Sequence, residues 1–408
     1  MALKVLAGLG AAAIFAAGSA FAQGQPAQAG ATPDAATQAA ASTGPGSFPV
    51  GPLTVYPGVN LALGHDDNLF LTSTAAKTSN YVVLSPYLRA EGRQGPHKFD
   101  ATLRIDNGQY MSSSADNYTN YSLLGNGDVV FSGRAGLRLL AEYRHGRDPR
   151  GSNDAAFTAT PNQYDNYGVG GVFRYGAPGA QGRIEIDAGA FRRRYTNNPA
   201  ATDSMNHDTN RIGGTFYWRV MPRTELLAQA SYTDYNYQQS TSTLGSTEKR
   251  YLVGVKWEAT AKTTGTLKIG RLQKDFNSPA QQNTSNSSWD AAIRWSPLTY
   301  SVFDFVTNRQ TYESTGLGST ILGTNYGVTW SHVWSSRLRT QVLANYRTDD
   351  YKGFPRNDDT TMLGLRASYE FRRWLRFGAE YTYWNRDSNI NTFEYKRNLF
   401  LLTVGATL

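Results

Sequence analysis

The pair of residues best suited to nucleophilic catalysis is Ser331 and His332, which are adjacent in the chain. A hydrolytic site needs the serine hydroxyl within hydrogen-bond reach of the imidazole, with a third polar group to orient the ring. Neighbouring side chains of a β-strand point to opposite faces, so two adjacent residues of one strand cannot make this contact. The chain has 5 His, and no other one stands in a pattern with serine and carboxylate. The sequence therefore predicts a protein that is not an enzyme.

Paired carboxylates are the second candidate for chemistry. The pairs Asp66-Asp67, Asp349-Asp350 and Asp358-Asp359 carry oxygen ligands of the kind that Ca²⁺ prefers. Solvated loop charge explains such pairs more simply, because they lie beside polar connections. The chain has 0 Cys, so a thiolate site is excluded, and its few His are widely scattered. We therefore expect neither a metal nor a cofactor.

Most other charged residues lie in stretches where polar and apolar residues alternate. In 374–386, Arg376 and Glu380 share one face, and Phe377 and Tyr381 share the other. This period of two indicates strands with two different faces. The stretches exceed the about 5–6 residues usual in soluble sheets. They lie near 53–64, 80–90, 98–110, 119–131, 135–146, 164–174, 182–195, 208–220, 224–237, 249–260, 264–276, 286–296, 299–311, 321–333, 337–350, 358–370, 374–386 and 393–408.

Short connections such as 131–134 and 334–337 alternate with longer polar ones such as 111–119 and 147–163. A transmembrane barrel has this arrangement, with short periplasmic turns and longer extracellular loops. Every backbone group must be hydrogen-bonded in lipid, so a spanning sheet must close on itself. We therefore predict an all-β fold, a transmembrane antiparallel β-barrel of about 18 strands in the outer membrane of a Gram-negative bacterium.

The polar faces would line a lumen wide enough for water. Their charges either pair across strands or form a selectivity surface for anionic or polyhydroxylated solutes. Inward aromatic residues such as Tyr217 and Trp384 could stack on sugar rings. The candidate solute contacts are Arg104, Arg138, Glu142, Arg183, Glu185, Arg219, Lys256, Asp290, Arg294, Arg337, Arg339, Arg366, Arg376 and Glu380.

The N-terminus predicts three regions. Residues 1–22 read as a cleaved signal peptide, with Lys4 before an apolar stretch and Ala20-Phe21-Ala22 as the cleavage site. Residues 23–52 are rich in Ala, Gln and Pro and are expected to form a disordered periplasmic linker. Residues 53–408 form the barrel. The formal charge of +8 is dispersed along strands, so nucleic acid is not an expected partner.

Both ends of the barrel carry motifs that resemble the putative beta-barrel porin 2 family. At the start, Asp67, Asn68 and Phe70 lie in "DDNLF", and Pro86 follows in "SPY". The matching positions near the end are Arg386, Ser388, Tyr395, Arg397 and Asn398.

The resemblance implies a barrel of about 18 strands and a role in the export of an exopolysaccharide across the outer membrane. It also implies the polysaccharide itself and a periplasmic export protein as partners. From the residues, the basic charge suits attraction to acidic lipopolysaccharide among the outer-membrane lipid, and the alternating apolar last strand suits recognition by the outer-membrane assembly machinery. A general diffusion porin, or a structural barrel that transports nothing, remains the alternative. The longest connection, 147–163, is short for a strong constriction, which favours export over the porin.

Overall fold

The computed structural model describes residues 46–151, 158–258, 262–314 and 317–407. The predicted signal peptide and most of the predicted linker lie outside these residues. Nineteen strands form one sheet, in which each strand pairs antiparallel with its neighbours. They are β1 (Phe48–Val50), β2 (Leu53–Asp66), β3 (Ser79–Gln94), β4 (His97–Tyr110), β5 (Tyr118–Val130), β6 (Ala135–Asp148), β7 (Asn162–Tyr175), β8 (Gly182–Tyr195), β9 (His207–Met221), β10 (Thr224–Tyr237), β11 (Ser246–Trp257), β12 (Thr263–Phe276), β13 (Thr284–Leu298), β14 (Ser301–Glu313), β15 (Thr320–Val333), β16 (Leu338–Lys352), β17 (Asn357–Arg372), β18 (Leu375–Ser388) and β19 (Tyr395–Thr407).

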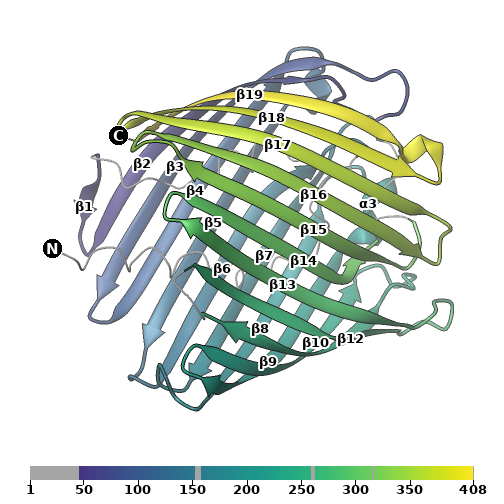
Figure 1. The fold of residues 1–408 in the computed structure, drawn as a ribbon. Helices are drawn as coiled ribbons and strands as arrows, with labels where there is room; N and C mark the ends of the chain where they lie inside the picture. Colours follow the sequence, from purple (N-terminus) through teal and green to yellow (C-terminus); the bar gives the residue numbers. More distant parts are fainter. Residues whose placement is uncertain (1–45, 152–157, 259–261, 315–316, 408) are drawn as a thin grey trace.

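The sheet closes into a barrel because β19 pairs with β2, from Leu399 opposite Asp66 to Thr407 opposite Gly58. Figure 1 shows the strands crossing the barrel at a marked tilt, as closure of a twisted sheet requires. Strands β2 to β19 form this ring of 18 strands, and each overlaps one of the stretches predicted from alternation. The fold class is therefore confirmed as a closed antiparallel barrel.

Strand β1 departs from the sequence-based expectation. Residues 48–50 fall in the predicted linker, yet they pair with Leu53–Val55 at the edge of β2. These three residues are thus part of the sheet and not disordered. Among the described residues no helix is long and apolar enough to span a membrane. The helical turns are α3 (Pro199–Thr202), η1 (Ser114–Asp116), η2 (Asp203–Met205) and η3 (Asn391–Phe393).

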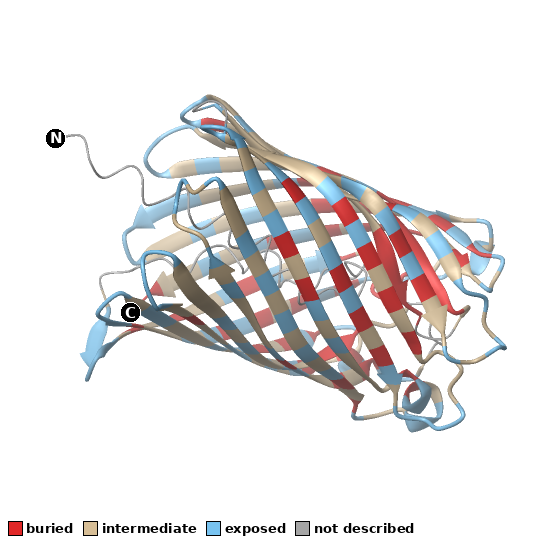
Figure 2. Ribbon diagram, turned by 90° about the horizontal axis from the view of Figure 1, so that it is seen from below, coloured by how far each residue is buried: buried red, intermediate tan, exposed pale blue. Residues whose placement is uncertain are grey.

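The register divides every strand into an outward and an inward face. On the outward face of β19 and β2, Leu402 lies opposite Leu63, and both are at least half exposed, at 61% and 50%. On the inward face of the same strands, Leu401 lies opposite Gly64 and is buried. Figure 2 shows this alternation as bands of exposed and buried residues along the strands. We call the end of the barrel with short connections the turn end, and the opposite end the loop end.

Candidate functional site in the lumen and its mouth

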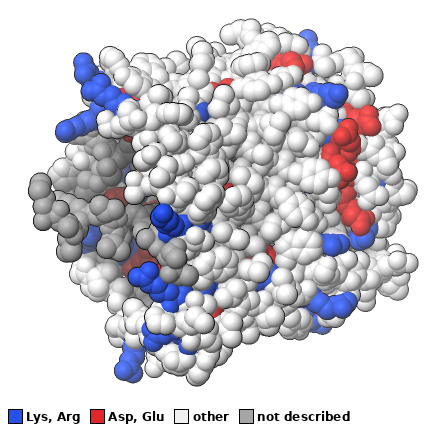
Figure 3. Space-filling view, in the orientation of Figure 1, with Lys and Arg blue, Asp and Glu red and all other residues white. Residues whose placement is uncertain are grey.

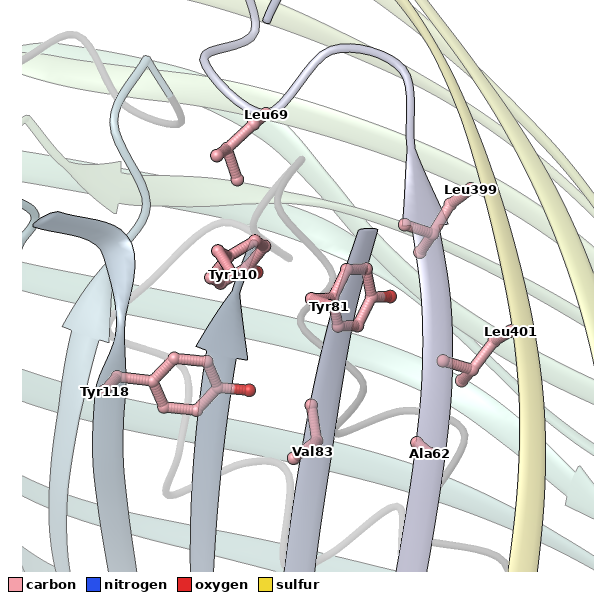
Figure 4. Close-up of a cluster of buried hydrophobic side chains, with 8 residues drawn as sticks. All are labelled: Ala62, Leu69, Tyr81, Val83, Tyr110, Tyr118, Leu399 and Leu401. Carbon is pink, nitrogen blue, oxygen red and sulfur yellow. The ribbon is translucent and has the colours of Figure 1, made fainter. Parts of the chain in front are cut away.

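The connection between β2 and β3, residues 67–78, folds into the barrel at the loop end. Leu69 is 4% exposed, and it packs in a cluster with inward side chains of β2, β3, β4, β5 and β19. Figure 4 shows Leu69 above Tyr110 and Tyr81, with Leu399 and Leu401 on the neighbouring strand. The next apolar residue, Leu71, is also buried and contacts Trp384 and Tyr395 on the other side of the seam. We call residues 67–78 the mouth loop.

Two polar contacts fix the start of the mouth loop to the last strand. The guanidinium of Arg397 donates two hydrogen bonds to the carboxylate of Asp66, at 3.0 and 2.6 Å. The side-chain amide and backbone N–H of Asn398 each donate to Asp67, at 2.7 Å. Asp66 is 0% exposed, so its charge depends on this pairing. Residues from the two ends of the barrel sequence therefore meet at one point.

Asn68 holds the inward bend of the mouth loop. Its amide nitrogen donates to the carbonyls of Thr72 and Lys396, both at 2.8 Å. Its side-chain oxygen accepts from the backbone N–H of Thr72 at 3.1 Å. Within this bend, Leu71 has a positive φ of 53°, an uncommon conformation for a residue with a side chain. The loop is thus held in a strained shape by the polar contacts of Asp67 and Asn68 and by two buried leucines.

Two further segments narrow the loop end. The connection after β6 reaches across the mouth, where the carbonyl of Gly151 lies 3.4 Å from the Arg386 guanidinium of β18. The guanidinium of Arg150 lies over the ring of Phe70 in the mouth loop, 4.0 Å from its centroid. This packing connects the mouth loop to the segment that crosses it.

The end of β14 also leans inward. Its pairing with β13 stops at Arg309, whereas its pairing with β15 continues to Glu313. Thr311 donates a hydrogen bond to Glu248 of β11. Glu313 accepts one from the ammonium of Lys274 on β12 and one from the hydroxyl of Tyr237 on β10, the latter at 2.7 Å. The β14–β15 hairpin is thereby fixed against strands that are not its neighbours.

Cations stacked on tyrosine rings surround the same level of the lumen. Each is buried and most are also paired with a carboxylate, which a charge removed from water requires. The distance between nitrogen and oxygen is 2.6 Å for Arg347 and Asp349 and 3.4 Å for Arg193 and Asp148. The stacked pairs are Arg147 on Tyr110 and Tyr118, Arg193 on Tyr164, Lys274 on Tyr235, Arg347 on Tyr312, Arg356 on Tyr351, and Arg386 on Tyr395.

Towards the turn end the lumen wall is more hydrated, and most of the predicted lumen residues lie there on the inward face. Arg294 donates to Asp304 at 2.6 Å with about a third of each side chain exposed, at 34% and 33%. Arg183 bridges two acids, Glu185 on its own strand and Glu225 two strands away. The other paired positions are Arg104 with Asp106, Arg138 with Asp128, Lys256 with Glu258, Asp290 with Lys268, Arg366 with Glu380, and Arg376 with Glu370.

Four predicted lumen residues have no ion pair in the described part of the chain: Glu142, Arg219, Arg337 and Arg339. The register places three of them on inward faces, with Arg219 opposite Glu225 and Glu142 opposite Leu124. Arg337 instead lies in the turn between β15 and β16, outside any strand. The charges of the wall therefore mostly pair with one another.

The family-motif positions divide into a connected group and separate ones. Asp67, Asn68, Arg397 and Asn398 meet at the barrel seam as described above. Arg386 donates to the carbonyl of Phe393 at 2.5 Å and covers the ring of Tyr395. Ser388 accepts from the backbone N–H of Ile390 at 3.2 Å, which shapes the last loop. Pro86 lies on the outward face of β3, opposite Val59.

The residues that the sequence offered for catalysis or metal binding make structural contacts instead. Ser331 accepts a hydrogen bond from Gln341 at 3.1 Å, whereas the ring of His332 packs between Trp330 and Trp334 on the outward face. Of the acidic pairs, Asp358 binds Arg356 and Asp349 binds Arg347. In the described ranges, no three His or acidic residues gather as a metal-ion site.

Sequence reasoning missed the inward loops. The connection 147–163 is short for a strong constriction by itself, but the structure places several segments inward at the mouth together: the mouth loop, the connection after β6 and the end of β14. The sequence carried a partial signal for three of the six buried cations stacked on tyrosine. These three lie near a strand end and stack on a tyrosine of the neighbouring strand: Arg147 on Tyr118, Arg193 on Tyr164 and Arg386 on Tyr395. Alternation alone does not distinguish such a position from a hydrated one.

Comparisons with known proteins complete this description. No curated protein matches the chain. A BenF-like porin from Pseudomonas fluorescens Pf-5 is 9% identical, with a TM-score of 0.49 over 87% of this chain and 99% of that one. OccK2 (OpdF) from Pseudomonas aeruginosa is 13% identical, with a TM-score of 0.49 over 87% and 98% of the two chains. A bacterial polysaccharide outer membrane secretin is 12% identical, with a TM-score of 0.37 over 86% and 98%.

The family comparison covers nearly the whole barrel. The family described as putative beta-barrel porin 2 matches residues 43–408, which include every strand and both sets of motif residues. The chain belongs to this family and is a porin-like outer-membrane β-barrel channel.

Proposed function

We propose that the barrel exports an exopolysaccharide across the outer membrane through its lumen. The observation that carries the proposal is the partial exposure of arginines and carboxylates on the inward face near the turn end, such as Arg294 and Asp304. A wall of paired charges presents many hydrogen-bond donors and acceptors but little net field. Such a wall suits a chain of hydroxyl groups better than a small ion.

Aromatic side chains add a second element of sugar recognition. Tyr217 lies on the inward face of β9, where the guanidinium of Arg183 covers its ring at 3.8 Å. Its hydroxyl donates to Glu185 at 3.1 Å. A planar ring beside hydrogen-bonding groups is an arrangement that can bind the apolar face of a sugar.

In this proposal the mouth loop must move for a polymer to pass. The loop is held by a few contacts of Asp67 and Asn68 and by two buried leucines, and the strained backbone of Leu71 offsets part of this, so a limited free-energy cost separates it from an open position. The proposal includes a periplasmic export partner, because a growing polymer has to be delivered to the turn end. It also includes lipopolysaccharide as a partner of the barrel in the outer membrane.

A diffusion porin is the second candidate, favoured by the narrowed mouth. Inward segments such as the mouth loop and the β14–β15 hairpin would select small solutes by size. This function needs no movement of the loop and no polymer.

The deciding experiment compares polysaccharide in a deletion strain with that in the same strain carrying the intact gene. Released, surface and periplasmic fractions are measured separately. Export predicts that polymer disappears from the outer fractions and that the intact gene restores it. Unchanged polymer in all fractions would reject export, and uptake of small sugars by the same strains would then test the porin.

A further inference from the structure

The outward face of the barrel is hollowed beside the seam. A groove with a volume of about 450 Å³ crosses β16, β17, β18, β19 and β2. Its walls include Leu338, Tyr369, Phe377, Leu402 and Val404, all on outward faces. We call it the seam groove.

Two alanines make the hollow. Ala367 and Ala379 lie opposite each other on β17 and β18. The next outward pair towards the turn end is Tyr369 with Phe377, and the pair on the other side is Leu365 with Tyr381. The small side chains therefore form a floor between two pairs of large ones. An extended apolar chain fits such a channel in the band that faces lipid.

Three arginines lie at the turn end of the seam groove, and the guanidinium of one of them, Arg372, lies 5.1 Å from the ring centroid of Phe371. Arg337 immediately precedes Leu338 in the turn between β15 and β16, and Arg372 and Arg373 lie at the turn between β17 and β18. The two turns are adjacent, because the carbonyl of Arg337 accepts from the backbone N–H of Glu370 at 2.9 Å. All three arginines are exposed, and none forms an ion pair with a described residue.

The surroundings of these arginines are typical of a membrane interface. Trp334 and Trp374 occupy the same two turns and are about half exposed, at 59% and 49%. Aromatic rings of this kind mark the boundary between acyl chains and headgroups. Figure 3 shows Lys and Arg side chains at both rims of this face, with the largest acidic group at the right, at the rim opposite the turns.

We propose that the seam groove and the arginines Arg337, Arg372 and Arg373 bind an anionic phospholipid. The guanidinium groups would hold the phosphate, which they match in charge and geometry, and one acyl chain would lie over Ala367 and Ala379. Short turns face the periplasm in barrels of this type, so the lipid belongs to the inner leaflet of the outer membrane. This site is separate from the lumen and does not depend on what the lumen transports.

The test is lipid retention measured by native mass spectrometry. Full-length protein is taken from vesicles with equal phosphatidylglycerol and phosphatidylcholine, and the lipid that stays bound is identified. The wild type should retain phosphatidylglycerol with a preference of about 10-fold to 100-fold, since each arginine near an anionic headgroup contributes several-fold. The triple variant R337Q/R372Q/R373Q should lose this preference.

Two further variants isolate the site. R93Q/R134Q/R223Q removes exposed arginines from the end of β3 and from the turns after β5 and β9, and it should keep the wild-type preference. Ala379→Leu fills the groove floor and should reduce retention of either lipid, while a heat-dependent gel shift checks that the barrel folds. The proposal would be overturned if the wild type showed no preference for phosphatidylglycerol, or if both triple variants lost that preference equally. It would also be overturned if the mass spectrum showed two copies of the chain together with no bound lipid.

Discussion

Replacing Asn68 by alanine should loosen the mouth loop without unfolding the barrel. The Asn68 side chain makes hydrogen bonds to the carbonyls of Thr72 and Lys396 and from the N–H of Thr72. Each such bond contributes about 0.5–1.5 kcal/mol net, so their loss costs the folded-in loop about 1.5–4.5 kcal/mol. The strands keep their own ladder of hydrogen bonds, since Asn68 lies beyond the end of β2.

This free energy translates into a change in open probability. A loss of about 3 kcal/mol raises the population of the released loop about 100-fold relative to the wild type. Single-channel recording in planar bilayers measures this population as the fraction of time in the conducting state. Asn68→Ala should show longer and more frequent openings, whereas the wild type should open only briefly.

A matched variant tests whether the effect belongs to the mouth loop. Asn389 also bonds backbone groups at the loop end, donating to the carbonyl of Pro355 at 2.9 Å, but it is exposed and holds no inward segment. Asn389→Ala should leave the open fraction unchanged. Equal traces for Asn68→Ala and the wild type would refute the idea that this side chain holds the mouth closed.

Three other predictions follow from named contacts. Arg397→Gln leaves the buried Asp66 carboxylate without its ion pair, so the temperature of the heat-dependent gel shift should fall, with a cost of about 3–5 kcal/mol; an unchanged temperature would contradict this assignment. Gly64→Ala places a methyl group 2.1 Å from the ring of Tyr81 and should destabilise the barrel by ~1–3 kcal/mol, whereas Gly125→Ala, with its nearest atom at 3.9 Å, should be tolerated in the same melting assay. Arg294→Asp should shift the reversal potential in planar bilayers towards cation selectivity. The melting temperature of the barrel should change little, because the pair with Asp304 is partly hydrated and contributes about 1 kcal/mol or less. The double variant R294D/D304R should restore the wild-type reversal potential.

The strands and their faces could be predicted from sequence because alternation is a local property. In 374–386 the pattern already separates Arg376 and Glu380 from Phe377 and Tyr381, and the structure keeps this separation. Lipid imposes it, since each outward position must be apolar across the membrane. The count of strands followed from the regular alternation of short and long connections.

The mouth could not be predicted in the same way because its contacts join distant parts of the chain. Asp66 and Arg397 are 331 residues apart, and only closure of the ring brings them together. The family motifs marked Arg397, and also Asp67 and Asn398, without indicating that the two ends of the barrel meet there. In the sequence, Leu69 is an apolar residue in a loop like any other. Only the folded barrel brings it against the inward side chains of β4 and β5.

The most direct test of the account is to lock the mouth loop in place. The chain has 0 Cys, so a pair introduced at Leu69 and Leu399, which pack in one cluster, would be free of competing thiols. Polysaccharide release is measured in cells carrying this variant before and after reduction, with each single cysteine as a control. The account predicts that release stops when the pair is oxidised and returns on reduction. Release at the wild-type rate through a fully cross-linked barrel would contradict it.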